Sequence, residues 1–246
     1  MKRLAAALMA LGLWAVPAAA TSCRDLVHDG NRYTVCEVDL AREELRLFLN
    51  RPDGSLYGQF SSVEADLRPE ETLTFAMNAG MYHDDRSPVG HYVENGEELM
   101  RVIPNAGPGN FGLLPNGVFC IREGRADVIE TLRFVDEAPA CRYATQSGPM
   151  LVIDGALHPR FLEDSTSRYV RNGVGTTADG RRAVFAISRN AVTFHEFGRL
   201  FRDELGLPQA LYFDGNISRL YAPGIGRNDP GFNMGPIVGV VAPSGS

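Results

Sequence analysis

Near the C-terminal end of the chain, an apolar run leads directly into an aspartate on a glycine turn. The segment reads ALYFDGNIS, so Asp214 and Gly215 follow residues 210–213. An Asp-Gly pair after a strand is usually only a turn, because both residues tolerate its dihedral angles. The run is continuous rather than alternating, which predicts a central strand covered on both faces. Carboxylates at the ends of such strands open into crevices where ligands bind, so Asp214 is a candidate catalytic residue.

Three other segments place polar residues beside small ones at a strand end. They are NAGMY from Asn78, QSGP from Gln146 and RNGVGTT from Arg171. Each alone has a plainer interpretation as a turn, a strand or a surface ion pair. Together with Asp214 they supply a carboxylate, a guanidinium, amides and hydroxyls, without a serine or cysteine nucleophile motif. We expect these four segments to converge on one cleft.

In this order, the segments NAGMY, QSGPMLVIDG, RNGVGTTADG and ALYFDGNIS resemble the phosphodiester glycosidase family, whose bacterial members carry the DUF2233-type domain. That family includes the "uncovering enzyme", N-acetylglucosamine-1-phosphodiester alpha-N-acetylglucosaminidase. The resemblance covers most of the chain, from about Tyr33 to Val241. Many relatives read Asp-Gly-Gly-Gly-Ser where this chain reads DGNIS from Asp214 to Ser218. The loss of two glycines predicts a different pocket and substrate.

The resemblance implies hydrolysis of a sugar–phosphate bond at the anomeric carbon of an envelope or exported glycan. Cleavage builds positive charge on the sugar and negative charge on the departing phosphate. Asp214 would stabilise that cation, or act as nucleophile or base toward water, while Arg171 would hold the phosphate through paired hydrogen bonds. We expect neither a cofactor nor a metal ion in the site. The expected substrate-binding residues are Asn78, Gly80, Tyr82, Gln146, Ser147, Gly148, Gly173, Gly175, Gly215 and Ser218.

Two other functions fit the sequence. One is a metal-dependent phosphodiesterase, although the loop that would bind the metal carries no established ligand motif. The other is a non-catalytic periplasmic protein that binds an anionic glycan. A glycosidase releases free sugar, a phosphodiesterase releases sugar phosphate, and a binding protein releases nothing. The ligands of the metal-dependent alternative would be His83, Asp84, Asp85 and His91.

The first twenty residues predict export. A basic start at Lys2 and Arg3, an apolar stretch and three alanines ending at Ala20 form a secretory signal peptide with a cleavage site. A weaker interpretation takes Cys23 as a lipid attachment site. We therefore expect one domain over residues 21–246, periplasmic or secreted. No later apolar segment approaches membrane-spanning length, and a net charge of −6 offers no electrostatic reason to bind nucleic acid.

Four cysteines remain after the predicted cleavage, which suggests two disulfides in an oxidising compartment. Cys23 and Cys36 lie symmetrically about Asp29-Gly30, a favoured two-residue hairpin turn. Directly opposed residues of a hairpin lie within disulfide range. The sequence therefore pairs Cys23 with Cys36 and leaves Cys120 with Cys141.

Asp-Gly and Asn-Gly pairs recur between apolar runs of strand character along the whole chain. They predict a substantial mixed, largely antiparallel sheet. One helix is clear: Thr193 and Glu196 form a capping box, an apolar stripe follows, and Gly206 ends it. Shorter helices are predicted around residues 62–67 and 160–169. The sequence therefore predicts a single α+β domain with a few packed helices.

Overall fold

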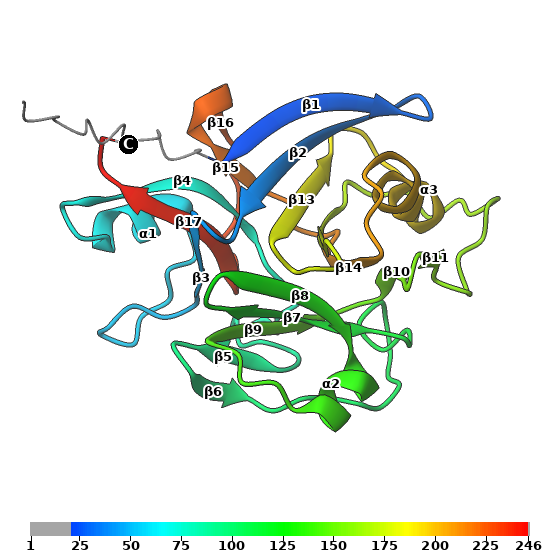
Figure 1. Cartoon of the computed structure of the whole chain (residues 1–246), viewed down its shortest axis with the longest axis horizontal. Coiled ribbons are helices and arrows are strands. Elements are labelled where there is room, and N and C mark those ends of the chain that lie inside the picture. Colours follow the sequence, from blue (N-terminus) through cyan, green and yellow to red (C-terminus); the bar gives the residue numbers. More distant parts are fainter. Residues whose placement is uncertain (1–20, 246) are drawn as a thin grey trace, which may run out of the picture.

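The computed structural model describes residues 21–245, so the predicted signal peptide lies outside the described residues. Three antiparallel β-sheets surround a shared core, and a few helices pack on the outside of the sheets (Figure 1). The predicted α+β fold is confirmed. Between residues 21 and 245, no helix is both long and apolar enough to cross a membrane.

The first sheet has seven strands in the order β1-β2-β13-β12-β14-β10-β11. Its interior strand β14 contains the apolar run that was predicted to be covered on both faces. Leu211 and Phe213 point into the core shared by the three sheets, while Ala210 and Tyr212 point into a second core on the other face. The strands are β1 (Ser22–His28), β2 (Asn31–Asp39), β13 (Arg182–Ser188), β12 (Asn172–Thr176), β14 (Gln209–Asp214), β10 (Met150–Ile153) and β11 (Ala156–Leu157).

The second and third sheets have five strands each, in the orders β16-β15-β4-β17-β3 and β6-β5-β9-β7-β8. Figure 1 shows the second at the left and the third at the bottom. The strands of the second sheet are β16 (Arg227–Asn228), β15 (Leu220–Ala222), β4 (Glu71–Asn78), β17 (Ile237–Pro243) and β3 (Glu44–Phe48). Those of the third are β6 (Glu97–Met100), β5 (Tyr92–Glu94), β9 (Tyr143–Ser147), β7 (Gly117–Arg122) and β8 (Arg125–Glu130).

The three sheets meet at a cluster of phenylalanines. Phe185 of the first sheet lies 4.8 Å from Phe75 of the second and 5.9 Å from Phe119 of the third, between ring centres. All three side chains are fully buried. Such aromatic pairs add specific edge and tilted contacts to the burial of apolar area. One core therefore fixes the three sheets relative to one another.

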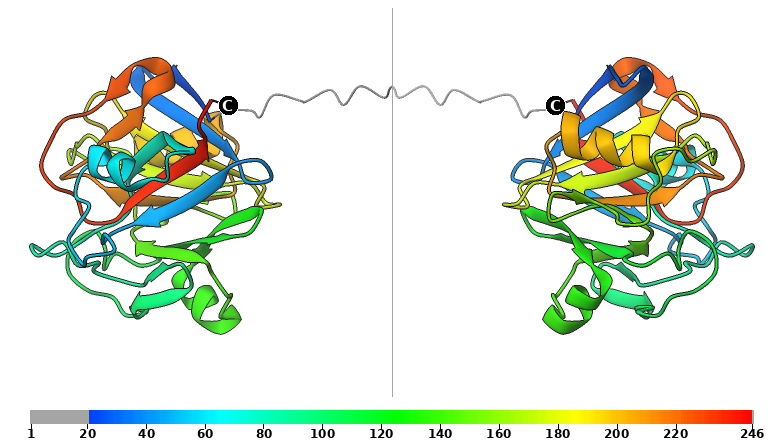
Figure 2. Two further views of the ribbon diagram at one scale, coloured as in Figure 1. Left: turned by 90° about the vertical axis from the view of Figure 1, so that its left-hand side faces the viewer. Right: turned by 90° about the vertical axis from the view of Figure 1, so that its right-hand side faces the viewer.

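The helices cover the outside of this arrangement. Figure 2 shows α1 and α3 on opposite sides of the molecule. The capping box of α3 is present: Thr193 Oγ1 accepts from the Glu196 N–H at 3.1 Å, and the Glu196 carboxylate accepts from the Thr193 N–H at 2.8 Å. The helical segments are α1 (Phe60–Asp66), α2 (Thr131–Glu137), α3 (Phe194–Arg199), its π-helical continuation η1 (Leu200–Glu204) and the short 3-10 helix η2 (Pro223–Ile225).

Two helix predictions differ from the structure. Residues 160–169 form a loop, because the run of Ser165, Thr166 and Ser167 favours local side-chain hydrogen bonds over a helix. The segment lacks an apolar stripe at helical spacing and packs through Phe161 on Phe194 instead. Conversely, α2 was not predicted from the sequence. It is only two turns long and presents one buried aromatic, Phe134, to the third sheet.

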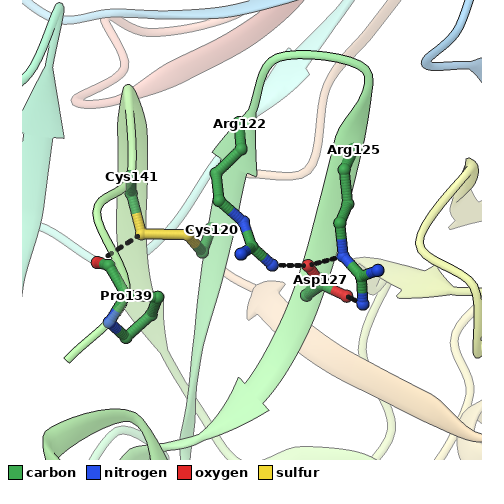
Figure 3. Close-up of a disulfide and its surroundings, with 6 residues drawn as sticks. All are labelled: Cys120, Arg122, Arg125, Asp127, Pro139 and Cys141. Atoms are coloured by element: carbon green, nitrogen blue, oxygen red, sulfur yellow. Dashed lines mark hydrogen bonds and ion pairs between the residues drawn. A yellow bond between two sulfur atoms is a disulfide. The ribbon is translucent and has the colours of Figure 1, made fainter. Parts of the chain in front are cut away.

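Both disulfides join the cysteines paired in the sequence analysis. Cys23 and Cys36 are direct partners in the β1–β2 hairpin, whose turn residues Asp29 and Gly30 have positive φ. Cys120 on β7 bonds to Cys141 beside the start of β9. Figure 3 shows this second bridge near an ion cluster in which Arg122 and Arg125 both bind the Asp127 carboxylate. Two disulfides fit an oxidising compartment.

A half-buried carboxyl links β5 of the third sheet to the residue that follows β3 of the second. Glu94 on β5 accepts from the Tyr92 hydroxyl at 2.9 Å and from the Leu49 N–H at 3.2 Å. Burial raises its pKa to about 7, although both hydrogen bonds act in the opposite direction. The folded state therefore binds this proton more tightly than the unfolded state. The stability that the proton contributes is complete below pH about 4.5 and is lost as the pH rises through about 7.

We therefore expect Glu94→Gln to reduce the loss of stability between pH 5 and pH 8. Glutamine keeps an acceptor for both donors and has no charge to desolvate. The melting temperature of the variant at pH 8 should therefore exceed that of the unchanged protein by a few degrees, on the order of 2–4 °C for each kcal/mol of added stability. Thermal unfolding at both pH values measures this. The exposed Glu97→Gln variant is the control, and equal pH dependence in both variants would contradict the role of Glu94.

Candidate active site

A cleft of about 560 Å³ opens beside the end of β14. The loop after β4, residues 109–110, the segment before β12 and the turn after β14 line it. Most of the lining side chains are polar or aromatic, so the cleft offers several hydrogen-bonding groups. They include Tyr82, Arg86, Tyr169, Tyr212, Asp214 and Asn216.

Asp214 lies half-buried in the wall of this cleft. Its Oδ1 accepts from the N–H groups of Gly215 at 2.6 Å and Asn216 at 3.0 Å. Burial raises the pKa of the carboxyl, and the backbone N–H groups of Asn216 and Gly215 act in the opposite direction. The turn thus holds the carboxylate in a fixed position, partly shielded from water, at the surface of the cleft.

Two buried asparagines fix the backbone at this position. Asn172 at the start of β12 donates through Nδ2 to the carbonyl oxygen of Asn78 at 2.9 Å and to its Oδ1 at 3.0 Å. Asn172 Oδ1 in turn accepts from the Asp214 N–H at 3.1 Å. The Arg219 N–H completes the network by donating to Asn78 Oδ1 at 2.9 Å. The pair therefore connects β4 of the second sheet to β12 and β14 of the first.

Ser218, another predicted site residue, closes the turn after Asp214. Its Oγ lies 3.0 Å from the Asp214 carbonyl oxygen and 3.1 Å from that of Val170. A hydroxyl so placed ties the turn back to the strand that precedes it. The structure thus gives Ser218 a bracing contact beside the cleft.

Arg171 is fully buried and lies behind the cleft wall. Its Nε donates to the Val192 carbonyl at 2.9 Å, and its guanidinium carbon lies 3.7 Å from the ring centre of Phe194. The rings of Tyr169 and Tyr212, which line the cleft, lie 5.3 and 5.4 Å from the same carbon. Its Nη1 has no hydrogen-bond partner within residues 21–245. Burial lowers the pKa of Arg171, while the Tyr212 hydroxyl acts in the opposite direction.

Gln146 and Ser147 are buried next to the site rather than in it. Gln146 Oε1 accepts from the N–H groups of His91 and Ile103 at 3.0 and 2.9 Å, so it anchors the loop between them. Ser147 Oγ donates to the Phe213 carbonyl at 2.9 Å, directly behind Asp214. Both side chains shape the surroundings of the cleft.

The predicted glycines differ in what they accommodate. An added Cβ at Gly215 would lie 2.2 Å from the Tyr212 hydroxyl, so only glycine lets that hydroxyl lie beneath the turn. Gly80, at φ +124°, leaves the same kind of space for Thr145 Oγ1. The others pack closely against neighbouring protein atoms, with an added Cβ within 2.7 Å of another residue; they are Gly148, Gly173 and Gly175.

The four residues of the metal-dependent alternative do not form one cluster among the described residues. His83 and Asp84 line the cleft, but His91 is buried and its Nδ1 lies 3.0 Å from the Met100 carbonyl oxygen. Asp85 Oδ1 accepts from the Ser87 hydroxyl at 2.6 Å. In the described part of the chain, residues 21–245, there is no group of three or more His, Cys, Asp or Glu able to hold a metal ion.

Several lining residues were not identified from the sequence. Tyr212 lies two positions before Asp214, and the period of two along a strand places both on one face. That spacing was a usable signal. Asn216 and Ile217, the two residues that depart from the Gly-Gly pattern expected from the family resemblance, both line the cleft. Arg86 and Tyr169 carried no local signal, because folding alone brings their segments to β14.

Comparison with known proteins identifies relatives of this chain. The profile of the phosphodiester glycosidase family matches residues 71–241. The Escherichia coli K12 uncharacterised protein YigE is 32% identical over 224 residues, which cover 91% of this chain and 86% of that protein.

Two solved structures share the fold. A hypothetical protein from Synechocystis superposes with a TM-score of 0.61 at 12% identity, and the match covers 90% of this chain but only 62% of that one. The second structure is the catalytic domain of the zebrafish N-acetylglucosamine-1-phosphodiester alpha-N-acetylglucosaminidase, auto-inhibited by its pro-peptide. It superposes with a TM-score of 0.61 at 13% identity, and the match covers 89% of this chain and 81% of that one.

We expect Asn172→Ala to lower the free energy of unfolding by about 1–3 kcal/mol, because it leaves buried polar groups of Asn78 and the Asp214 N–H without a partner. Urea denaturation measures this difference. The exposed Asn105→Ala variant should change stability by less than about 0.5 kcal/mol. Equal stability of the two variants would show that the asparagine pair does not hold the sheets together.

Proposed function

Because the chain belongs to the phosphodiester glycosidase family, we propose that it hydrolyses a sugar phosphodiester at the anomeric carbon. The products are the free sugar and a phosphomonoester. The observation that carries this proposal is the Asp214 carboxylate, half-buried in the cleft and held by two backbone N–H groups. A fixed charge in a partly water-excluded site acts strongly on charge that develops beside it.

In the proposed reaction, the bond between the anomeric carbon and the phosphate oxygen breaks. Both bonding electrons leave with the phosphomonoester, and positive charge develops on the sugar. Asp214 stabilises that charge, and a water molecule supplies the new oxygen on the anomeric carbon and releases one proton. A phosphate monoester leaves readily as an anion, so the reaction depends less on a strong general acid than hydrolysis of an ordinary glycoside.

For Arg171 we propose an indirect role. Its guanidinium has no exposed surface and lies against Tyr169 and Tyr212, whose other sides line the cleft. From there it holds the rings of Tyr169 and Tyr212 in place. Its positive charge also lies near the Tyr212 hydroxyl, beside the Asp214 carboxylate. The buried position thus favours electrostatic support over the direct phosphate contact that the family resemblance implies.

The substrate class follows from the family and the cleft together. The zebrafish relative is named for a reaction on an N-acetylglucosamine phosphodiester, and we propose a sugar phosphodiester for this chain as well. The two cleft-lining residues in place of glycines, Asn216 and Ile217, support a different sugar or acceptor. The two disulfides support action on a glycan outside the cytoplasm, in the periplasm or after secretion.

We expect Asp214→Asn to fold normally but to turn over sugar phosphodiesters with a kcat lower by roughly a hundredfold or more. Asparagine fits the same turn while removing the charge. Mass detection of both fragments, on a panel of sugar phosphodiesters and nucleotide sugars, measures the activity. A phosphate monoester and free sugar are the expected products of the unchanged enzyme.

Asp179→Asn provides the matched control, since Asp179 also precedes a glycine but lies in an exposed turn at the other end of β12. Its kcat should equal that of the unchanged enzyme. Near-normal turnover by a well-folded Asp214→Asn variant would refute the catalytic role. Release of sugar phosphate would indicate a phosphodiesterase instead, and the absence of any product would favour a binding protein.

A further inference from the structure

Arg86 is a fixed cation in the wall of the cleft. It lies in the loop after β4, and its Nε donates to the Asn233 carbonyl at 3.0 Å while its Nη1 donates to the Asp84 carbonyl at 2.7 Å. The guanidinium carbon also lies 5.3 Å from the ring centre of Tyr82. These contacts hold the guanidinium in one place and leave Nη2 without a hydrogen-bond partner among the described residues.

The charge of Arg86 is not neutralised by a neighbour. Within residues 21–245 no carboxylate pairs with it, whereas Arg46, for example, binds both Glu44 and Glu71. Its two protein partners are neutral carbonyl groups. A guanidinium held by carbonyls keeps its full charge for an anion, and its planar donors match the oxygens of a phosphate.

The backbone conformation of Arg86 also indicates a function for its side chain. The residue has φ of +73° in a tight turn, where the Arg86 N–H donates to the His83 carbonyl and the His83 N–H to the Ser87 carbonyl. Glycine or asparagine is favoured in this conformation, and arginine is not. An unfavourable backbone angle at a cleft residue points to a function for its side chain.

A second donor without a partner lies in the same wall. The hydroxyl of Tyr82 is buried and makes no hydrogen bond within the described residues. Gly235 packs against the Tyr82 ring, where an added Cβ would lie 2.6 Å from its carbons, so the ring is held in place. Burial and the charge of Asp214 raise the pKa of Tyr82, which keeps its proton available for donation.

We propose that Arg86, supported by Tyr82, binds the phosphate group of the substrate, so that the sugar lies toward Asp214. This inference rests on the proposed function and deepens it. It assigns the phosphate contact to Arg86, through the free Nη2, and not to the buried Arg171. It also restricts the substrates to anionic phosphodiesters, because a neutral glycoside would leave the Arg86 charge without a counter-ion.

The first test is the binding of inorganic phosphate to the mature chain, measured by titration calorimetry at low ionic strength. Arg86→Gly removes the side chain and suits the positive φ, so the variant should fold. We expect it to bind phosphate at least tenfold more weakly than the unchanged protein. Arg86→Lys should be intermediate, because an ammonium keeps the charge but not the planar donors.

Arg181→Ala is the matched control, because Arg181 is exposed at the end of the β12–β13 pair remote from Asp214. It should bind phosphate like the unchanged protein. The inference is overturned if Arg86→Gly, with a normal melting curve, binds phosphate as tightly as the control. It is equally overturned if the unchanged protein does not bind phosphate.

A kinetic measurement separates this inference from the proposed function. With a sugar phosphodiester that the unchanged enzyme cleaves, Arg86→Gly should raise KM and lower kcat/KM at least tenfold. An unchanged kcat/KM would overturn the role of Arg86 and leave the glycosidase proposal intact. Loss of phosphate binding in Arg86→Gly, in a protein that cleaves no sugar phosphodiester, would support the anion site and refute the glycosidase proposal.

Discussion

The contact between Asn78 and Asn172 holds the backbone of Asp214 in the cleft wall. It joins two sheets through buried amides. These amides also bind backbone groups at the last residues of β4 and β14 and at Arg219, just before β15. Apolar packing around Phe185 holds the three sheets together, but each dispersion contact is individually weak. Hydrogen bonds between buried groups are directional and costly to leave unmade. The amide pair therefore fixes the position of Asp214 more precisely than the apolar core alone would.

The charges around the cleft follow from this geometry. Asp214 is partly removed from water, which raises its pKa, yet its turn supplies N–H groups that favour the charged form. Arg171 lies behind the aromatic wall without a carboxylate partner in the described residues, and Arg86 lies in the wall itself. Two carboxylates, Asp84 and Asp214, and one guanidinium, Arg86, thus line the cleft, and a second guanidinium, Arg171, lies behind its wall. That distribution suits a substrate that separates into a sugar cation and a phosphate anion.

Local sequence rules predicted the parts of this protein that depend on neighbouring residues. The hairpin that pairs Cys23 with Cys36 and the capping box at Thr193 follow from turn and cap chemistry over a few positions. The burial of Arg171 did not follow, because its cover comes from Phe194 and Tyr212, far along the chain. Arg86 was missed for the same reason: its fixed position depends on the Asn233 carbonyl, across a separation of 147 residues.

The central claim is that the bond to the anomeric carbon breaks, and identifying the broken bond tests this claim most directly. Attack at phosphorus that expels the sugar oxygen yields the same free sugar and phosphomonoester as attack at the anomeric carbon, so product identity alone does not separate the two routes. Hydrolysis in water labelled with heavy oxygen, followed by mass analysis of both products, does separate them. Cleavage beside Asp214 predicts the label in the anomeric hydroxyl of the sugar and none in the phosphomonoester. Label in the phosphomonoester would contradict the account.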